Sequence, residues 1–315
     1  MGGKIMVVIE TRGLTKTYGK VQALQGADLT VEEGKIFGFL GPNGAGKTTM
    51  IKILTGLIPP TSGTCLVNGF KTMEQGADHR RNIGYLSQKP AYYPWMTGEE
   101  LLNFVGELFN IPTIERKRRT KELLEIAGLG KAGKRRISGY SGGMVQRLGI
   151  AQAIYNSPKI VFLDEPVSAL DPVGRRDVLA FIGSLKKTST VFMSTHILAD
   201  VERVCDEVAI IKDGIVLLQE DTEALLRRFA TGIAVLAFES ALDCTVLFNV
   251  LDDGSDTIQV DGSHIRMHAQ QFSRNRDRIL QFVLEKHLSL CGINEEPTSL
   301  EDVFMQIIGK GGSYV

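Results

Sequence analysis

The chain of 315 residues lacks the long apolar runs that membrane-spanning proteins need. A membrane-spanning helix takes roughly 20 consecutive apolar residues, and the best candidate, residues 208–218, is interrupted by Lys212, Asp213 and Gly214. The N-terminus has no signal-peptide pattern, and Met6 stands where a myristoylation motif needs Ser or Thr. We therefore expect a cytoplasmic protein, whose contact with any membrane must come through another molecule.

Cysteine is scarce, and the chain has no net charge. Cys65, Cys205, Cys244 and Cys291 are scattered without C-x-x-C spacing, which favours buried thiols in a reducing compartment over disulfides or metal ligands. Lys and Arg together number 36, as do Asp and Glu, so the formal net charge is +0. Nucleic-acid-binding domains are usually basic, so we expect no nucleic-acid partner.

A glycine-rich loop follows the apolar run of residues 36–40. It matches the pattern G-x-x-x-x-G-K-[ST] at every position, and residues 50–54 after it predict a helix. In this context the glycines turn backbone N–H groups toward a phosphate, and the helix N-terminus adds partial positive charge. We expect Lys47 to reach the β- and γ-phosphates of a nucleotide and the Thr48 hydroxyl to bind Mg²⁺. The loop assigned to nucleotide binding consists of Gly41, Pro42, Asn43, Gly44, Ala45, Gly46, Lys47, Thr48 and Thr49.

Two carboxylates follow a second apolar strand, residues 160–163. In a fold with a phosphate-binding loop, Asp164 at such a strand end is expected to hold Mg²⁺, directly or through water. Glu165 is expected to face the γ-phosphate and to polarise the attacking water. The alternative is an ordinary buried strand that meets a charged turn, and the glycine loop earlier in the chain makes this alternative weaker.

A second helix with an anion-binding N-terminus is predicted to begin near Ser141. Ser141 is a suitable N-cap, and Gly142 and Gly143 leave backbone N–H groups open to a ligand. Two phosphate-binding helix ends and one nucleotide per chain suggest that two copies assemble, each closing the nucleotide site of the other.

Together these motifs resemble those of the ATP-binding cassette (ABC) ATPases, over residues 4 to about 222. The glycine loop and the Asp164–Glu165 strand look like the two Walker motifs, and Ser141 to Gly143 looks like the family signature. Four smaller motifs in the family order carry one residue of interest each: Tyr18, Gln88, Asp171 and His196. Taken singly, such residues are more often ordinary loop or strand residues.

The resemblance implies a role for each of these four residues. Tyr18 would stack on adenine, and Gln88 would sense Mg²⁺ and water and relay to a membrane partner. Asp171 closes the D-loop (residues 168–171), and His196 would contact the γ-phosphate. Catalysis is therefore assigned to Glu165, His196 and Gln88. Binding of ATP is assigned to the glycine loop with Tyr18, Ser141, Gly142, Gly143 and Asp171, and binding of Mg²⁺ to Thr48, Gln88 and Asp164.

One departure lies in the signature, which commonly reads Leu-Ser-Gly-Gly-Gln in the family. Here Tyr140 and Met144 stand at its ends, and Met144 cannot make the hydrogen bonds of a glutamine. A Tyr-Ser-Gly-Gly-Met start resembles the drug- and ion-exporter branch served by ABC-2-type permeases. The resemblance thus implies an ATP-hydrolysing subunit that works as a homodimer with a separate permease, peripheral on the inner face of the cell membrane.

Two other functions stay open at this point. Some importer ATPases also carry a small C-terminal domain that binds a regulatory ligand. Soluble ABC ATPases that act on ribosomes or DNA do not transport, but they usually have two cassettes or a long coiled coil, and neither is visible in this sequence.

The order of elements fits this family. Residues 5–40 alternate apolar and polar and predict strands, and further strands are predicted around 64–70, 82–86, 159–163, 191–194 and 207–212. Helices are predicted within residues 90–157, the first opened by a capping box at Thr97. Basic runs at 116–119 and 134–136 are expected to be solvated. The fold class is α/β, a P-loop NTPase with a RecA-like core, an antiparallel β subdomain and a helical subdomain at about 90–157.

The pattern changes after residue 222. Short strands are predicted at 233–238, 245–251, 257–260 and 264–267, with helices that include residues 272–286. A capping box at Thr298 predicts a last helix to about residue 308. We therefore divide the chain into an ABC ATPase domain, residues 1–222, and a small C-terminal α+β domain, residues 223–315, compatible with a ferredoxin-like βαββαβ order.

Overall fold

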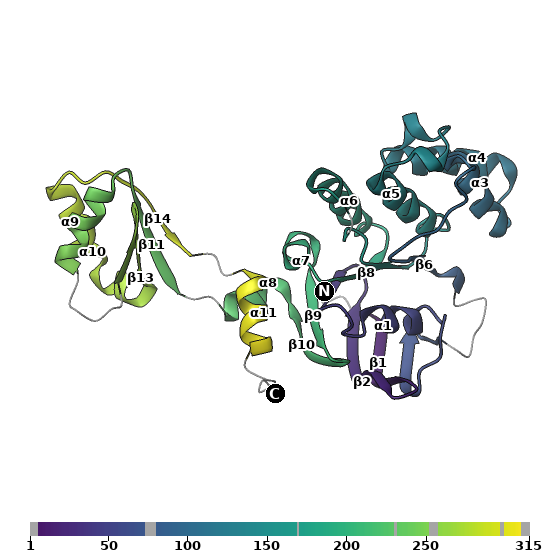
Figure 1. Ribbon diagram of the computed structural model, residues 1–315, viewed down its shortest axis with the longest axis horizontal. Helices are drawn as coiled ribbons and strands as arrows, with labels where there is room; N and C mark the ends of the chain where they lie inside the picture. The colour runs from purple at the N-terminus through teal and green to yellow at the C-terminus, as the bar shows by residue number, and fades with distance from the viewer. Residues whose placement is uncertain are drawn as a thin grey trace, which may run out of the picture. The chain divides into compact units, whose positions relative to one another are not determined.

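The computed structural model describes residues 6–72, 80–168, 170–229, 232–251, 258–296 and 299–309 (Figure 1). The chain divides into two compact units. One unit comprises residues 1–224 and 304–315, and the other comprises residues 225–303.

The first sheet of the larger unit is antiparallel, with the strand order β2-β1-β4-β5. A two-residue turn at Gly19, with φ 56°, joins the first two strands where Tyr18 pairs with Val21. Leu14 and Leu24 are among the side chains that this sheet buries, so one of its faces packs into the core. The strands are β1 (Val7–Tyr18), β2 (Val21–Glu32), β4 (Ser62–Val67) and β5 (Phe70–Lys71).

The second sheet has six strands in the order β10-β9-β3-β8-β7-β6. Its strands are β3 (Ile36–Leu40), β6 (Ile83–Leu86), β7 (Ile160–Asp164), β8 (Thr190–Thr195), β9 (Glu207–Lys212) and β10 (Ile215–Asp221). All neighbours are parallel except β10, which pairs antiparallel with β9. Every residue of β3, β7 and β8 is buried, which explains their apolar runs, because a parallel sheet is covered on both faces.

The parallel strands bring the predicted site segments to one edge of this sheet. The glycine loop joins β3 to α1 (Lys47–Leu54), Gln88 follows β6, Glu165 follows β7, and His196 follows β8. The carboxyl ends of neighbouring parallel strands lie at the same edge, which is where α/β sheets bind ligands. The helices that follow are α6 (Pro172–Leu185), α7 (Leu198–Val204) and α8 (Thr222–Arg228).

A group of helices is inserted between β6 and β7, which confirms the predicted helical subdomain. Thr97 Oγ1 accepts from Glu100 N at 3.1 Å, and Thr97 N donates to Glu100 Oε2 at 2.7 Å. The predicted capping box is therefore present. The inserted helices are α3 (Gly98–Leu108), α4 (Thr113–Ile126) and α5 (Gly142–Ala153), with short 3₁₀ turns at Gly130–Ala132 and Ile137–Gly139.

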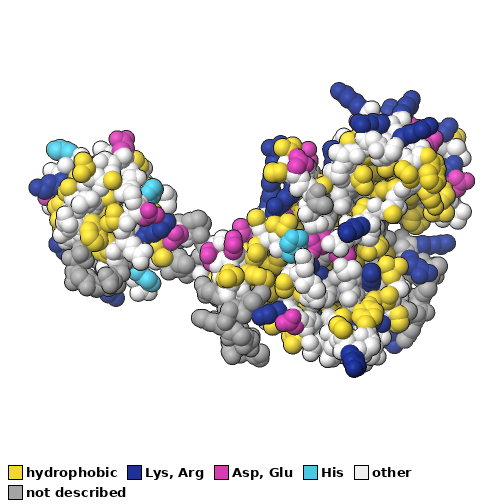
Figure 2. All heavy atoms as spheres, in the orientation of Figure 1, with side chains coloured by type: hydrophobic (Ala, Val, Ile, Leu, Met, Phe, Trp, Pro, Cys, Tyr) yellow, Lys and Arg dark blue, Asp and Glu magenta, His cyan; other side chains and the backbone are white. Residues whose placement is uncertain are grey.

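Basic side chains gather along the outer edge of this insert (Figure 2). The side chain of Arg118 is 68% exposed and lies 3.5 Å from Glu122. Arg119 is only part-exposed, because it donates hydrogen bonds to the Tyr155 carbonyl oxygen and to Ser157 Oγ. The basic run at 116–119 is thus solvated in part, and Arg119 also joins α4 to the residues that follow α5.

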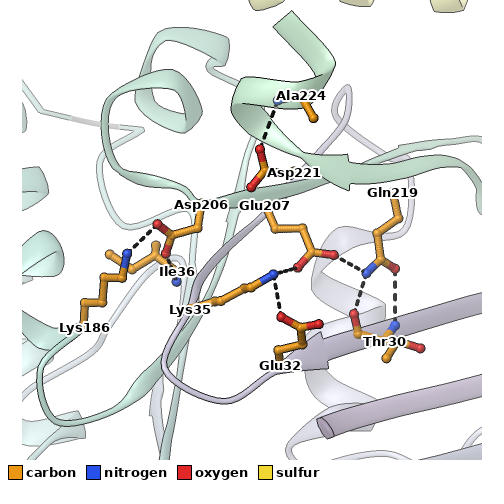
Figure 3. A network of polar contacts seen from close by, with 10 residues as sticks. All are labelled: Thr30, Glu32, Lys35, Ile36, Lys186, Asp206, Glu207, Gln219, Asp221 and Ala224. Atoms are coloured by element: carbon orange, nitrogen blue, oxygen red, sulfur yellow. Dashed lines mark hydrogen bonds and ion pairs between the residues drawn. The ribbon is translucent and has the colours of Figure 1, made fainter. Parts of the chain in front are cut away.

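A polar network connects the two sheets of the larger unit (Figure 3). Lys35 Nζ lies 2.6 Å from Glu32 Oε2 and 3.2 Å from Glu207 Oε2. Gln219 on β10 donates to Glu207 Oε1 at 2.7 Å and accepts from Thr30 N on β2 at 3.2 Å. These contacts hold the β9–β10 edge against the antiparallel sheet.

The second unit contains a four-stranded antiparallel sheet in the order β12-β13-β11-β14. Its elements are β11 (Ile233–Phe238), α9 (Ala241–Leu251), β12 (Ile258–Asp261), β13 (His264–His268), α10 (Ala269–Glu285) and β14 (Leu290–Glu295). This βαββαβ order confirms the ferredoxin-like arrangement. Leu236, Leu247, Ile265 and Ile279 belong to its separate hydrophobic core. Helix α11 (Leu300–Gly309) follows.

Several predicted elements differ from the structure. Residues 245–251 form part of helix α9 instead of a strand, because Cys244 and Leu247 face the core at helical spacing. Strand β14 was not predicted. The strands predicted around 64–70 and 82–86 both form: β4 belongs to the antiparallel sheet and β6 to the six-stranded sheet.

The last helix begins with a different cap. Thr298 lies outside the described residues, and the reciprocal hydrogen bonds instead join Ser299 and Asp302, at 3.1 and 3.2 Å. Within the described ranges, no helix is long and apolar enough to cross a membrane.

Candidate active site

Two positions of the glycine loop leave no room for a side chain, and one of them, Gly46, also has a backbone conformation that favours glycine. A Cβ atom on Gly41 would lie 2.3 Å from the Ile211 carbonyl oxygen. Gly46 has φ 107°, and a Cβ atom there would lie 2.4 Å from the Ala23 carbonyl oxygen. The loop is therefore closely packed against β9 and β2, and its path into α1 is fixed.

Lys47 lies at the centre of this loop and is almost fully buried. Its Nζ donates to the carbonyl oxygens of Gly41 and Pro42, at 2.8 and 3.0 Å. The same Nζ lies 3.1 Å from Glu165 Oε1, and both side chains are at most 5% exposed. A buried charge pair of this kind needs its hydrogen bonds to offset desolvation, and here the loop carbonyls supply them.

A cavity of about 330 Å³ opens beside Lys47. It joins the glycine loop to Gln88 and Glu165, which belong to segments that follow β6 and β7. The lining residues are Ala23, Asn43, Gly44, Gly46, Lys47, Thr48, Thr49, Gln88 and Glu165. The cavity combines backbone N–H groups, a lysine and a carboxylate, the groups that phosphoryl transfer uses.

Glu165 is held in an uncommon backbone conformation at the end of β7. Its φ is 49°, in the left-handed region that non-glycine residues seldom occupy. Its N–H donates to the carbonyl oxygen and to the Oγ of Ser194, at 3.2 and 3.0 Å. Its Oε2 lies 2.6 Å from His196 Nδ1. Such strain persists only where the surroundings impose it, and here it sets the carboxylate between Lys47 and His196.

Asp164 is buried directly before Glu165. Its side chain is 1% exposed, and its Oδ1 accepts from Ser194 Oγ at 2.6 Å. Burial raises the pKa of the Tyr85 phenol to about 12, and the negative charge of Asp164 contributes to this rise. Mg²⁺ prefers oxygen ligands, often one or two carboxylates together with phosphate oxygens. The Asp164 carboxylate, with the Thr48 hydroxyl and the Gln88 amide at the cavity, is a donor set that fits this ion.

The remaining predicted site residues lie elsewhere in the described part of the chain. Ser141 is exposed and caps α5, where its Oγ accepts from Met144 N at 3.3 Å. Asp171 is the exposed N-cap of α6, and Ala169 of the same loop lies outside the described residues. Tyr18 is 47% exposed, with Lys16 Nζ 5.1 Å from its ring centre. Tyr18, Ser141, Gly142, Gly143 and Asp171 are not among the described residues that line the cavity.

Two residues at the site were not assigned from the sequence. Ala23 on β2 lines the cavity and approaches Gly46. Ser194 hydrogen-bonds to both Asp164 and Glu165. The sequence signal for Ser194 was its position with Thr195 at the end of the strand, directly after the apolar residues 191–193 and before His196.

The fold and the cavity together define a class of protein, the nucleotide-hydrolysing P-loop enzymes. A profile of the ABC transporter family matches residues 24–168. Over 304 residues the chain is 38% identical to YxlF, an uncharacterized ABC transporter ATP-binding protein of Bacillus subtilis (strain 168), a match covering 96% of this chain and 99% of YxlF. Over 306 residues it is 33% identical to BcrA, the bacitracin transport ATP-binding protein of Bacillus licheniformis, covering 96% and 98%.

Solved structures of ATP-binding cassettes are also similar to this chain. One is a dimeric structure of a post-hydrolysis state of the ATP-binding cassette MJ0796 bound to ADP and Pi. It has a TM-score of 0.62 and 29% identity to this chain, and the match covers 68% of this chain and 98% of that one. The chain belongs to the ATP-binding proteins of ABC transporters, and it is an ABC ATPase.

Proposed function

We propose that this chain is the ATP-hydrolysing subunit of an ABC exporter and that it works as a homodimer. The dimer is supported by one observation: the nucleotide cavity and the signature residues lie in different places on the same chain. The cavity at Lys47 lacks Ser141, whose helix α5 has an exposed N-terminus elsewhere in the unit. Ser141 and Gly142 are exposed, whereas Gly143 is buried. The first N–H groups of a helix have no partner within that helix, so these residues would present the N-terminus of α5 to the phosphates held by a second copy.

The proposed chemistry uses the side chains around Lys47. MgATP supplies the phosphoryl group that is transferred to water. Thr48 and Asp164 would hold the Mg²⁺, with Gln88 beside it, and Tyr18 would contact the adenine. Lys47 would leave Glu165 to bind the γ-phosphate, and Glu165 would then be free to accept a proton from water. His196, which lies 2.6 Å from Glu165 Oε2, would keep this carboxylate in position.

A groove on the helical insert is the surface that we propose for the permease. This α3 groove, of about 480 Å³, is lined by Thr97, Glu99, Glu100, Asn103, Phe104, Glu107 and Lys134. Nearby Tyr93 and Trp95 are exposed and have ring centres 5.1 Å apart. The cytoplasmic loops of membrane proteins are rich in Lys and Arg, so a groove lined by three glutamates and by Phe104 suits such a loop. The chain would then be peripheral on the inner face of the membrane.

Export is the direction that we propose, and Tyr140 with Met144 in the signature supports it. BcrA, a relative that matches this chain over nearly its full length, is named as a bacitracin transport protein. We therefore propose an antibiotic-like substrate. Loss of this chain should then increase the sensitivity of its host to membrane-active antibiotics. A requirement for an external binding protein would favour import instead.

Affinity capture of the tagged chain from detergent-solubilised host membranes tests this proposal. A multi-span permease in fixed stoichiometry is expected. Phe104→Asp in the α3 groove should reduce its recovery, whereas Ile126→Asp, at an exposed position of α4 outside the groove, should not. Recovery of ribosomal or DNA-bound partners alone would contradict the proposal and would leave a soluble ABC ATPase.

A further inference from the structure

The segment before the signature is joined to the start of α3 by backbone hydrogen bonds. Ile137 N donates to Met96 O at 2.8 Å, and Ser138 N donates to Pro94 O at 3.1 Å. Glu99 N donates to Gly133 O at 2.9 Å. Thr97 and Arg136 form an antiparallel bridge between the same two segments. Residues 94–99 and 133–138 therefore form one small structural body within the insert.

The hydroxyl of Tyr140 adds a side-chain connection to this body. Tyr140 Oη donates to the Ala132 carbonyl oxygen at 2.8 Å. Burial raises the pKa of this phenol, and its neighbours Gly98 and Arg135 oppose the rise. A Cβ atom on Gly98 would lie only 2.5 Å from Tyr140 Oη. The first residue of α3 is thus in direct contact with the hydroxyl, and Gly98 leaves the room that this contact needs.

Tyr140 stands between two surfaces that have different partners in the proposed function. The α3 groove is lined by Thr97 and Glu99, which flank Gly98, and by Lys134 from the joined segment. On the other side, Tyr140 is followed directly by Ser141, the N-cap of α5. A molecule in the groove therefore touches both segments of this body, and the Tyr140 hydroxyl contacts the same body at Gly98. Tyr140 lies one residue before the signature.

We propose that Tyr140 is a positioning residue that couples the α3 groove to the signature helix α5. The proposal rests on the proposed function, because it takes the signature as the surface that closes a second copy's nucleotide site. Coupling of this kind is reciprocal. Closure on MgATP at Ser141 should stiffen the start of α3, and occupation of the groove should favour closure by the same factor. A leucine, common in the family at this position, has no hydroxyl and cannot donate the hydrogen bond to the Ala132 carbonyl oxygen.

Hydrogen exchange measured by mass spectrometry, in the full chain with Glu165→Gln, tests the coupling. The Glu165→Gln change should slow hydrolysis, so that the MgATP-bound state persists. With Tyr140 present, MgATP should slow exchange in peptides covering residues 94–100 and in peptides covering residues 142–150. Tyr140→Phe keeps the ring and removes the hydroxyl. It should reduce the response of residues 94–100 by about fivefold, the effect expected for a lost hydrogen bond, and leave the response of 142–150 intact.

Tyr155→Phe is the matched control for this experiment. Tyr155 Oη also approaches a glycine of α3, since a Cβ atom on Gly106 would lie 2.6 Å from it. It donates to the Arg116 carbonyl oxygen at 3.1 Å and lies 3.0 Å from Thr120 Oγ1. This variant removes a buried hydroxyl from the same subdomain but leaves the connection to the signature. Both responses to MgATP should persist in it.

Several results would overturn the coupling. The first is an unchanged response of residues 94–100 in Tyr140→Phe. The second is loss of both responses in that variant, or the same loss in Tyr155→Phe, because the hydroxyl would then only stabilise the fold. The third is a parent chain whose signature responds to MgATP while residues 94–100 do not. If the signature of the parent does not respond at all, the dimer of the proposed function fails, and the coupling fails with it.

Discussion

At the scale of single residues, one buried carboxylate connects the two basic groups of the site. Glu165 contacts Lys47 Nζ through one oxygen at 3.1 Å and His196 Nδ1 through the other at 2.6 Å. The lysine is thus neutralised by the same group that we propose as the base. Binding of a phosphate at Lys47 and release of Glu165 are therefore parts of one exchange of partners.

Replacing Lys47 with methionine should weaken ATP binding. A hydrogen bond to a charged group contributes about 1.5 to 3 kcal/mol, so the dissociation constant should rise by about 10- to 100-fold. Titration with a fluorescent ATP analogue measures it. Lys52→Met, which removes an exposed lysine from the same helix, is the control and should bind as the parent does. Unchanged affinity in Lys47→Met would contradict the assignment of the loop.

Replacing Ser194 with alanine should raise the Mg²⁺ concentration that ATP hydrolysis requires. The hydroxyl donates to Asp164 Oδ1 at 2.6 Å and accepts from Glu165 N at 3.0 Å. Groups that orient a metal ligand typically contribute about 10- to 100-fold in metal affinity or activity. The ATPase rate measured against Mg²⁺ concentration should show a raised Mg²⁺ requirement. Ser189→Ala, which removes a buried hydroxyl beside the opposite end of β8, should keep the parent's requirement.

The sequence predicted the candidate site through motifs, and motifs are local. The glycine loop, Gln88 and Glu165 lie around one cavity, and their roles stay predictions. The function of Ser194 could not be predicted from the local sequence. It depends on the strand register, which places Ser194 opposite Asp164 in the neighbouring strand. The same is true of Ala23, which reaches the cavity from a strand of the other sheet.

At the scale of elements, strong local signals predicted structure well and mixed signals did not. The capping box at Thr97 and the buried runs of the parallel sheet formed as expected. Residues 245–251 are rich in β-branched and aromatic side chains, which favour strands, yet they lie in α9, where Cys244 and Leu247 pack into the core of the second unit. Strand β14 forms by long-range pairing with β11, and no local sequence pattern predicts this pairing.

The capping box of α3 gives a prediction at this scale. Thr97→Ala removes the acceptor of the Glu100 N–H and should lower the free energy of unfolding by about 1 kcal/mol. Urea denaturation measures this change. Thr113→Ala is the control, because Thr113 is exposed at the start of α4 and provides no side-chain cap there. Equal effects of the two substitutions would contradict the contribution of the cap.

At the scale of the whole molecule, the two units have separate hydrophobic cores. The cavity, the α3 groove and the signature helix all belong to residues 1–224. The proposed chemistry therefore uses no residue of the second unit. The predicted domain boundary after residue 222 stays a prediction, as does the exporter direction.

The four thiols of the chain should differ sharply in reactivity. Burial raises the pKa of Cys65 to about 11 and also raises the pKa of Cys205 and Cys244, whereas Cys291 is exposed. The thiolate is the reactive form, and at pH 8 a thiol with a pKa near 11 is ionised to about one part in a thousand. A disulfide reagent at pH 8 should therefore modify one thiol rapidly, and Cys291→Ser should remove this phase. If two or more thiols of the folded protein reacted rapidly, the burial of Cys65, Cys205 and Cys244 would be contradicted.

The central claim is that two copies close on MgATP and that Glu165 is the base. Glu165→Gln keeps the shape of the side chain but cannot accept the proton. Light scattering during size exclusion should show a dimer of this variant with MgATP and a monomer without it, and hydrolysis should collapse while ATP stays bound. A variant that binds MgATP but stays monomeric, or that hydrolyses ATP at the parent's rate, would contradict the account.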